Sequence, residues 1–141
     1  MSPLADVVTA SREVTVTSSR SRKVAILAEL LNQLDAGEVA ICVGFLSGVP
    51  RQGRVGVGYS MLYGIDVRPA PEASLSVADV DRAITEIEAA SGSGSATRRR
   101  QLLAELLGHA TEEEAEFLRR LLTGNLRQGA LAGLMADAVA R

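Results

Sequence analysis

The feature that most constrains this chain is an internal repeat. When the sequence is shifted so that residue 19 meets residue 95, residues 19–53 align without gaps on residues 95–129. The pentapeptide Leu27–Leu31 recurs as Leu103–Leu107, and the tripeptide Arg51–Gly53 recurs as Arg127–Gly129. Leucine-rich helices share short words by chance, but two words at a single offset favour a duplicated unit.

The composition indicates that the duplicated unit is helical. The chain has 141 residues, of which 47% are hydrophobic and only 3% aromatic, so its core must consist of aliphatic side chains and alanine. Such a core favours packed helices over a β-sandwich. We predict an all-α fold in which two pseudo-symmetric helical repeats pack into one multi-helix domain. Repeat one is expected at about 17–65, a connecting helix at about 76–90 and repeat two at about 93–141.

Helical spacing and capping signals locate the elements. Apolar residues recur at helical intervals from Val24 to Leu34, from Leu102 to Leu107 and from Leu131 to Ala138. Ser76 is expected to cap the connecting helix, and Thr111 with Glu114 three residues later is typical of a capping box.

Positive charge is concentrated at the expected starts of two helices. The six cations concerned are Arg20, Arg22, Lys23, Arg98, Arg99 and Arg100. The N-terminal end of a helix carries partial positive charge, so cations there are disfavoured unless an anion binds. Two such places on one body would suit a polyanion with regular phosphates, whereas the alternative interpretation is a solvated basic face. The net charge of −2 does not by itself point to nucleic acid, and the acidic residues lie elsewhere.

Glycine-containing loops are the second candidate feature. The segments 51–58 and 124–129 combine glycine with arginine, and glycine allows close approach of backbone to a phosphate while arginine can bind it through two contacts. The run Ser91–Ser95 alternates serine and glycine. It is either a flexible linker or a loop that lets the backbone approach a ligand. Its repetition in position with Thr17–Ser19 of the first copy favours the second interpretation.

The sequence offers no candidate constellation for catalysis. It contains no phosphate-binding P-loop, and its single histidine, His109, is expected to have a structural role at a helix end. Cys42 is the only cysteine, which excludes an internal disulfide, and Lys23 is the only lysine. We expect no metal site and no membrane-spanning segment, and we expect a cytoplasmic location.

Four phrases carry a resemblance to a known family. The first is the segment 124–140, and the others are Thr17–Lys23, Val55–Gly58 and Ser91–Ser95 before the arginine-rich helix start. In this order they resemble the N-terminal DNA-binding domain of ATP-dependent DNA ligases, with actinobacterial forms the most similar. Gln128 departs from the pattern, because an aliphatic residue is common at that position.

The resemblance implies a function. It implies a bacterial, non-catalytic domain that grips the phosphate backbone and minor groove of nicked double-stranded DNA, while catalytic domains of the same chain seal the nick in repair, replication or recombination. ATP and Mg²⁺ are expected for the whole enzyme and no cofactor for this part. The adenylation domain with its Lys-x-Asp-Gly motif and the OB domain are absent. We expect a fragment of the family's domain that lacks its terminal helices. The expected location within the cytoplasm is nucleoid-associated.

The candidate DNA-binding residues follow from the charge pattern, the loops and the resemblance. They are Ser19, Arg20, Arg22, Lys23, Arg54, Gly56, Gly58, Gly94, Ser95, Arg98, Arg99, Arg127, Gln128 and Gly129. Two other functions remain open from the sequence. A helical protein–protein adaptor would use exposed leucines in the glycine-rich loops. A small sequence-specific regulator would need a recognition helix bearing side chains that read base edges, and none of the expected helices is so equipped.

Overall fold

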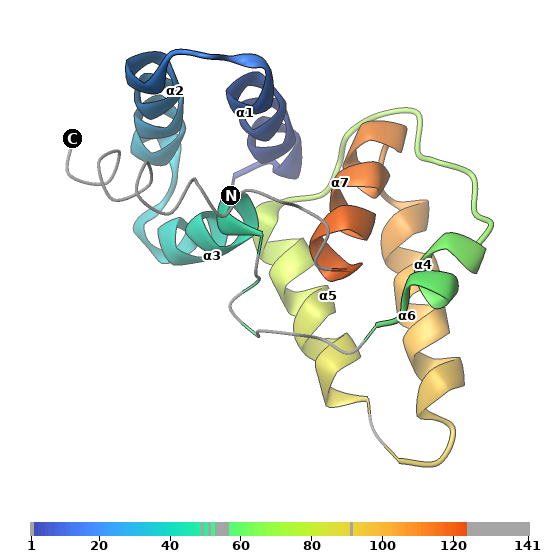
Figure 1. Cartoon of the computed structure of the whole chain (residues 1–141). Helices are drawn as coiled ribbons and strands as arrows, with labels where there is room; N and C mark the ends of the chain where they lie inside the picture. The colour runs from blue at the N-terminus through green and yellow to red at the C-terminus, as the bar shows by residue number, and fades with distance from the viewer. Residues whose placement is uncertain (1, 49, 51, 53–56, 91, 124–141) are drawn as a thin grey trace.

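The computed structural model describes residues 2–48, 50, 52, 57–90 and 92–123. The regular elements among them are α-helices joined by loops (Figure 1). The helices are α1 (Leu4–Val16), α2 (Arg20–Gln33), α3 (Ala36–Ser47), α4 (Tyr59–Gly64), α5 (Val77–Ala89), α6 (Ser95–Gly108) and α7 (Glu112–Thr123). The only β-type pairing among the described residues is one isolated bridge, between Pro3 and Ser76. The predicted all-α class is therefore confirmed.

Local signals explain where several helices begin and end. The Ser76 side chain accepts a hydrogen bond from the Asp79 backbone N–H at the start of α5, and the Asp79 carboxylate accepts one from Ser76 N–H in return. Thr111 and Glu114 form the same reciprocal pair at the start of α7. Both predicted caps are thus confirmed. Helix α3 ends at Ser47 and is followed by the C-cap Gly48, whose φ of 91° lies in the left-handed region that glycine adopts without strain.

Each predicted repeat forms part of a unit of three helices, and the name repeat is used below for that whole unit. Helix α1, which the sequence analysis did not predict, precedes α2 as α5 precedes α6. A shift that places Leu4 on Val77 brings every fully buried α5 position onto a buried α1 position. The pairs are Leu4/Val77, Val7/Val80, Val8/Asp81, Ser11/Ile84 and Val14/Ile87. The units α1–α2–α3 and α5–α6–α7 are therefore structural counterparts.

An approximate two-fold axis relates the two units. Leu4 N–H donates to the Leu75 carbonyl (2.9 Å), and Val77 N–H donates to the Ser2 carbonyl (2.8 Å). When Leu4 is matched with Val77, and Ser2 with Leu75, each of these hydrogen bonds becomes the other. Such reciprocal contacts are the signature of a two-fold axis. The helix packing is reciprocal as well, since α1 packs on α7 and α5 packs on α3. The axis passes near the bridge at the centre of the molecule.

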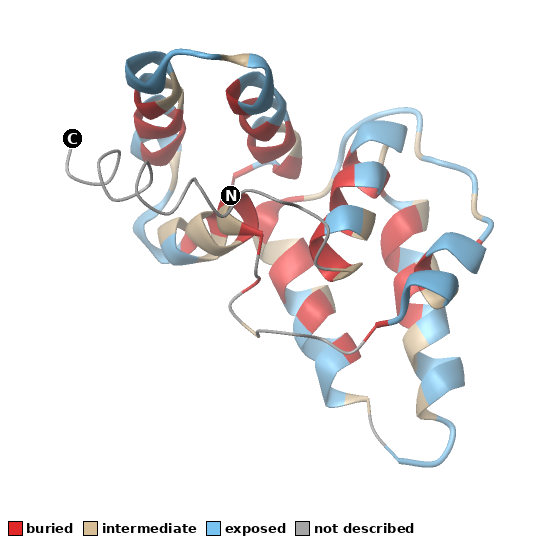
Figure 2. Cartoon of the chain, in the orientation of Figure 1, coloured by how far each residue is buried: buried red, intermediate tan, exposed pale blue. Residues whose placement is uncertain are grey.

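The core runs through both units without interruption (Figure 2). Leu27 and its counterpart Leu103 are fully buried, and so are Phe45 of α3 and Ile84 of α5. Two equivalent carboxylates, Glu38 and Glu114, are also buried. Glu114 belongs to the α7 cap, whereas Glu38 accepts hydrogen bonds from Ser2 N–H and Ser2 O–H. Inside the core, Glu38 thus provides an acceptor for the polar groups of Ser2, and Glu114 provides one for a backbone N–H at the start of α7.

The short helix α4 leaves repeat one and packs against α6 and α7 of repeat two. Leu62 is its buried residue. The helical pattern predicted at residues 130–141 lies outside the described residues, and the domain limits given above remain predictions. Among the described residues, no helix is long and apolar enough to cross a lipid bilayer.

Candidate nucleic-acid interface

The basic start of α2 is an exposed and self-capped helix end. Ser19 is the N-cap residue, and its hydroxyl accepts a hydrogen bond from the Arg22 backbone N–H at 3.3 Å. Arg20 and Arg22 are exposed in the first turn, and Lys23 follows in a half-buried position. This turn contains no acidic residue, so the helix dipole and the side-chain charges have the same sign.

The basic start of α6 has a different construction. Gly94 is its N-cap with φ +81°, and no side chain caps the helix. Helix α6 begins at Ser95, so Arg98 to Arg100 stand at its fourth to sixth positions, slightly later than the predicted first turn. The Arg98 and Arg100 side chains are exposed, but Arg99 is half-buried and its Nε donates to the Ala90 carbonyl at 3.2 Å. The Arg99 side chain therefore ties α6 to the end of α5 and does not extend freely into solvent.

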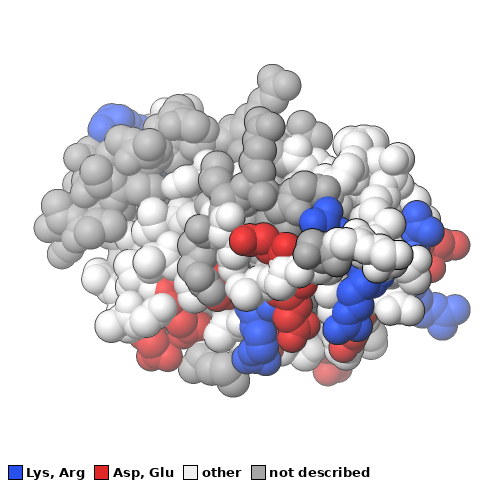
Figure 3. Space-filling view, turned by 90° about the horizontal axis from the view of Figure 1, so that it is seen from below, with Lys and Arg blue, Asp and Glu red and all other residues white. Residues whose placement is uncertain are grey.

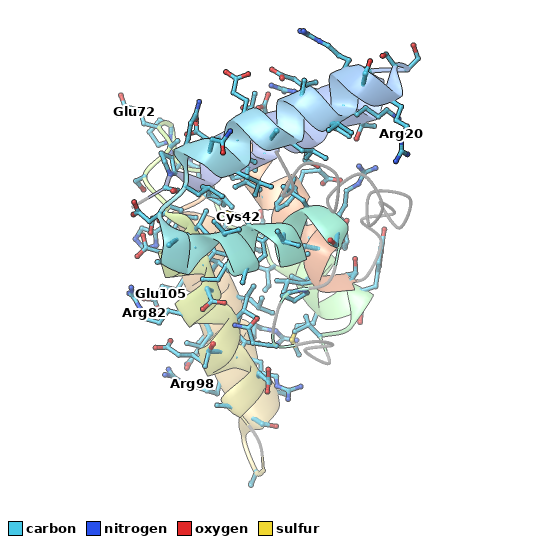
Figure 4. The ribbon with its side chains drawn as sticks, turned by 90° about the vertical axis from the view of Figure 1, so that its left-hand side faces the viewer. Arg20, Cys42, Glu72, Arg82, Arg98 and Glu105 are labelled. Carbon is cyan, nitrogen blue, oxygen red and sulfur yellow. The ribbon has the colours of Figure 1, made fainter. Side chains whose placement is uncertain are left out.

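The two basic helix starts do not form one pocket. Arg20 lies at one end of the molecule and Arg98 near the other (Figure 4). This separation follows from the two-fold arrangement, because equivalent points far from the axis lie far from each other. A single small anion could not contact both sets, whereas an extended polyanion could.

Gln52 attaches the loop between α3 and α4 to helix α5. Its Nε2 donates to the Asp81 carbonyl (3.1 Å), the Asp81 carboxylate (2.9 Å) and the Thr85 hydroxyl (2.9 Å). This role of Gln52 was not predicted from the sequence. The glutamine of the repeated Arg-Gln-Gly word therefore faces the protein in repeat one.

The remaining candidate loop residues are only partly placed. Gly58 is described, is exposed and serves as the N-cap of α4. The candidates Arg54, Gly56, Arg127, Gln128 and Gly129 lie outside the described residues.

Each repeat also has an acidic cleft between its first two helices, of about 220 Å³ in both cases. The carboxylates lining the two clefts are equivalent pairs. They are Asp6/Asp79, Glu13/Glu86 and Glu29/Glu105. Carboxylates repel phosphates, so a bound polyanion is expected to avoid these two surfaces.

Elsewhere on the surface, exposed ion pairs place positive and negative side chains next to each other. Arg12 pairs with Glu113 at 2.8 Å and Arg120 with Glu116 at 3.5 Å. On the lower face of the molecule, too, basic and acidic side chains lie close to one another (Figure 3). The positive charge is thus less separated from the negative charge than the sequence suggested, and the helix starts matter more than any broad basic surface.

Cys42 and His109, whose side chains are of chemically reactive types, lie in surroundings that fit a structural role. Burial raises the pKa of the Cys42 thiol to about 12, with nearby Glu38 acting in the same direction, so the reactive thiolate form is disfavoured at neutral pH. His109 Nδ1 lies 2.8 Å from the Glu105 carbonyl, which fits the predicted role at a helix end. No cluster of three potential metal-binding side chains occurs in the part of the chain that the structure describes.

Comparison with known proteins identifies the family. The model of the family described as DNA ligase N terminus matches residues 60–140. A protein of Nocardia farcinica called a probable DNA ligase is 54% identical over 136 residues, which are 96% of this chain and 26% of that protein. Proteins of the same description from Rhodococcus opacus and Saccharopolyspora erythraea are 50% and 51% identical, over 95% and 97% of this chain and 27% of their own lengths. The chain spans about a quarter of these relatives, and it belongs to the DNA ligase N-terminal family.

Proposed function

We propose that this chain is the non-catalytic DNA-binding module of an ATP-dependent DNA ligase. It grips the phosphate backbone and minor groove of nicked duplex DNA so that catalytic domains of the same enzyme can seal the nick. ATP and Mg²⁺ serve those domains, and the enzyme acts on the bacterial chromosome in the cytoplasm during repair, replication or recombination. Membership of the DNA ligase N-terminal family supports this function.

The observation that carries the proposal is the recurrence of a basic helix start in equivalent places of two halves related by a two-fold axis. The two antiparallel strands of a duplex are themselves related by two-fold axes, so a pseudo-two-fold protein can present equivalent groups to both strands. Arg20 and Arg98 lie at the two ends of the molecule, as this arrangement requires (Figure 4).

The proposed contacts are backbone contacts. Helix starts with exposed arginines and a backbone close to glycine suit phosphate oxygens, and such contacts fix position without reading sequence. The residues concerned in the described part are Ser19, Arg20, Arg22, Lys23, Gly58, Gly94, Ser95 and Arg98. Arg99 contributes by positioning α6, and Arg54, Gly56, Arg127, Gln128 and Gly129 complete the proposed set.

Fluorescence anisotropy over a salt series tests the proposal. The chain is titrated with a labelled nicked duplex and with an unrelated sequence of equal length. We expect similar affinities for both sequences and a steep fall of affinity with ionic strength, since each phosphate contact contributes about 0.9 to the slope of log K against log salt. A flat salt response, or no binding to DNA, would contradict the proposal and favour the helical adaptor.

A further inference from the structure

The exposed aromatic surface of the described residues is concentrated in one place. The chain contains two phenylalanines, two tyrosines and no tryptophan. Phe45 and Phe117 are buried in the core, whereas Tyr59 and Tyr63 are 60% and 40% exposed. The two tyrosine rings stack on each other with centroids 4.2 Å apart and an angle of 22° between their planes. We call Tyr59 and Tyr63 the tyrosine pair.

Packing of α4 against the domain holds the tyrosine pair in place without burying it. The two residues are one helical turn apart, and Leu62 between them is fully buried where α4 meets α6 and α7. The guanidinium carbon of Arg119 on α7 lies 5.8 Å from the centre of the Tyr63 ring, a cation–π contact that fixes this ring from the neighbouring helix. The apolar anchor of α4 is therefore Leu62, and Tyr59 leaves most of its surface to solvent.

The tyrosine pair lies directly beside a proposed DNA contact. Tyr59 follows Gly58, the last glycine of the loop to which the proposed function assigns phosphate contacts. Arg119 adds positive charge next to the rings, while the neighbouring Arg120 is paired with Glu116. A strand whose phosphates approach Gly58 would bring its bases and sugars within reach of the tyrosine pair.

We propose that the tyrosine pair is a stacking site for an unpaired base of the bound DNA. This inference rests on the proposed function and adds a substrate preference to it. The bases of an intact duplex are stacked on both faces, so an aromatic side chain can stack only on a base that has left the helix, as at a gap, a flap or a frayed nick. Stacking on an aromatic ring is tolerant of sequence, because every base has a π-face. The chain accordingly prefers interrupted strands with a free base over continuous duplex.

Two measurements on the whole chain test this site. The tyrosine pair contains both tyrosines of a chain without tryptophan, so intrinsic fluorescence reports on it alone. The probes are a continuous blunt-ended duplex and the same duplex with a three-nucleotide flap. We expect the flap DNA to quench tyrosine fluorescence more strongly than the continuous duplex at equal saturation. Anisotropy then compares Tyr59→Ala with Tyr59→Phe, which keeps the ring, and with Val16→Ala, which removes exposed apolar surface elsewhere.

The expected result is a loss of affinity that is confined to the Tyr59→Ala variant and to the flap DNA. Tyr59→Ala should lower affinity for the flap DNA on the order of tenfold and leave affinity for the continuous duplex unchanged. Tyr59→Phe and Val16→Ala should bind both DNAs like the unsubstituted chain. Equal affinities of Tyr59→Ala and the unsubstituted chain for flap DNA would overturn the stacking site while leaving the proposed function standing. An equal loss on both DNAs would also overturn it, and absence of all DNA binding would remove the proposed function as well.

Discussion

The starts of α2 and α6 occupy equivalent places in the two repeats, but they are built differently. Helix α2 is capped by the Ser19 hydroxyl, whereas α6 begins after Gly94 and has no side-chain cap. The counterpart of Ser19 in the sequence alignment is Ser95, which is the first residue inside α6 and not its cap. Arg99 is held against Ala90, while Lys23 at the equivalent position has no such backbone contact among the described hydrogen bonds.

The interiors of the same helices have changed much less. Leu27, Leu30 and Leu31 are buried and reappear as the buried Leu103, Leu106 and Leu107. Close packing restricts these positions, because loss of a single methylene group in a core is costly. Helix ends in solvent are free of that restriction. The comparison therefore teaches that the duplicated unit keeps the residues that its core requires and varies the residues at its exposed helix starts.

The largest expected effect tests whether the two interiors are equivalent. Leu27→Ala and Leu103→Ala each remove a fully buried side chain from the same place in its repeat. Each substitution should lower the free energy of unfolding by about 2–5 kcal/mol. Urea unfolding followed by circular dichroism measures both variants. If only one of the two is destabilised, the repeats share a sequence pattern without sharing a structural role.

A smaller effect is expected at the two caps. Gly94→Ala places a side chain at φ +81° with no neighbouring atom within 4 Å, so the cost is backbone strain of about 1–2 kcal/mol. Ser19→Ala removes a capping hydrogen bond and should cost about 1 kcal/mol. Gly37→Ala, in open space within α3, is the matched control and should be neutral or stabilising. Thermal melts check all three, and a Gly94→Ala variant as stable as Gly37→Ala would refute the strained cap.

The smallest effect depends on pH. The Ser76 backbone N–H lowers the pKa of Asp79 below its usual 3.8, so the folded state prefers the ionised carboxylate. Its contribution to stability is complete well above pH 3.8 and disappears as the pH falls through the lower folded value. Asp79→Asn should thus lower the free energy of unfolding at pH 7 by less than about 1 kcal/mol. The stability of this variant should also fall less than that of the unsubstituted chain as the pH becomes acidic. Asp6→Asn, its counterpart, should change little, because Pro3 has no N–H to donate. Melts from pH 7 to pH 2 distinguish the two, and identical profiles would contradict this difference.

Much of the fold could be predicted because local signals agreed with tertiary packing. The helices α2, α5, α6 and α7 carry apolar residues at helical spacing, and Ser76 and Thr111 mark two of their starts. Helix α1 was missed because it is rich in β-branched residues, such as Val7, Val8 and Thr9, which favour helix only weakly. Packing against α2 and α7 outweighs this weak propensity.

The candidate site was predictable in its charges but not in its contacts. The sequence shows that Arg98 and Arg99 are neighbours near a helix start, yet only the structure shows that Arg99 bonds to Ala90. It shows the repeated Arg-Gln-Gly word, yet the attachment of Gln52 to α5 depends on residues 29 and 33 positions further along the chain. The one available signal for the tyrosine pair was the spacing of Tyr59 and Tyr63 by four residues in a chain with few aromatic residues.

The most direct test of the account compares charge removal in the two halves. Arg22→Ala with Lys23→Ala alters repeat one, and Arg98→Ala with Arg99→Ala is the equivalent change in repeat two. Binding of each double variant to nicked duplex is measured by anisotropy across a salt series, with melts to check folding. If both halves grip the DNA backbone, each pair should weaken binding. The salt slope should fall by about 1–2 for Arg22 with Lys23 and by about 1 for Arg98 with Arg99, since each lost phosphate contact removes about 0.9 and Arg99 only positions α6. If one pair abolishes binding and the other changes neither affinity nor slope, only one half contacts DNA and the two-sided grip is wrong.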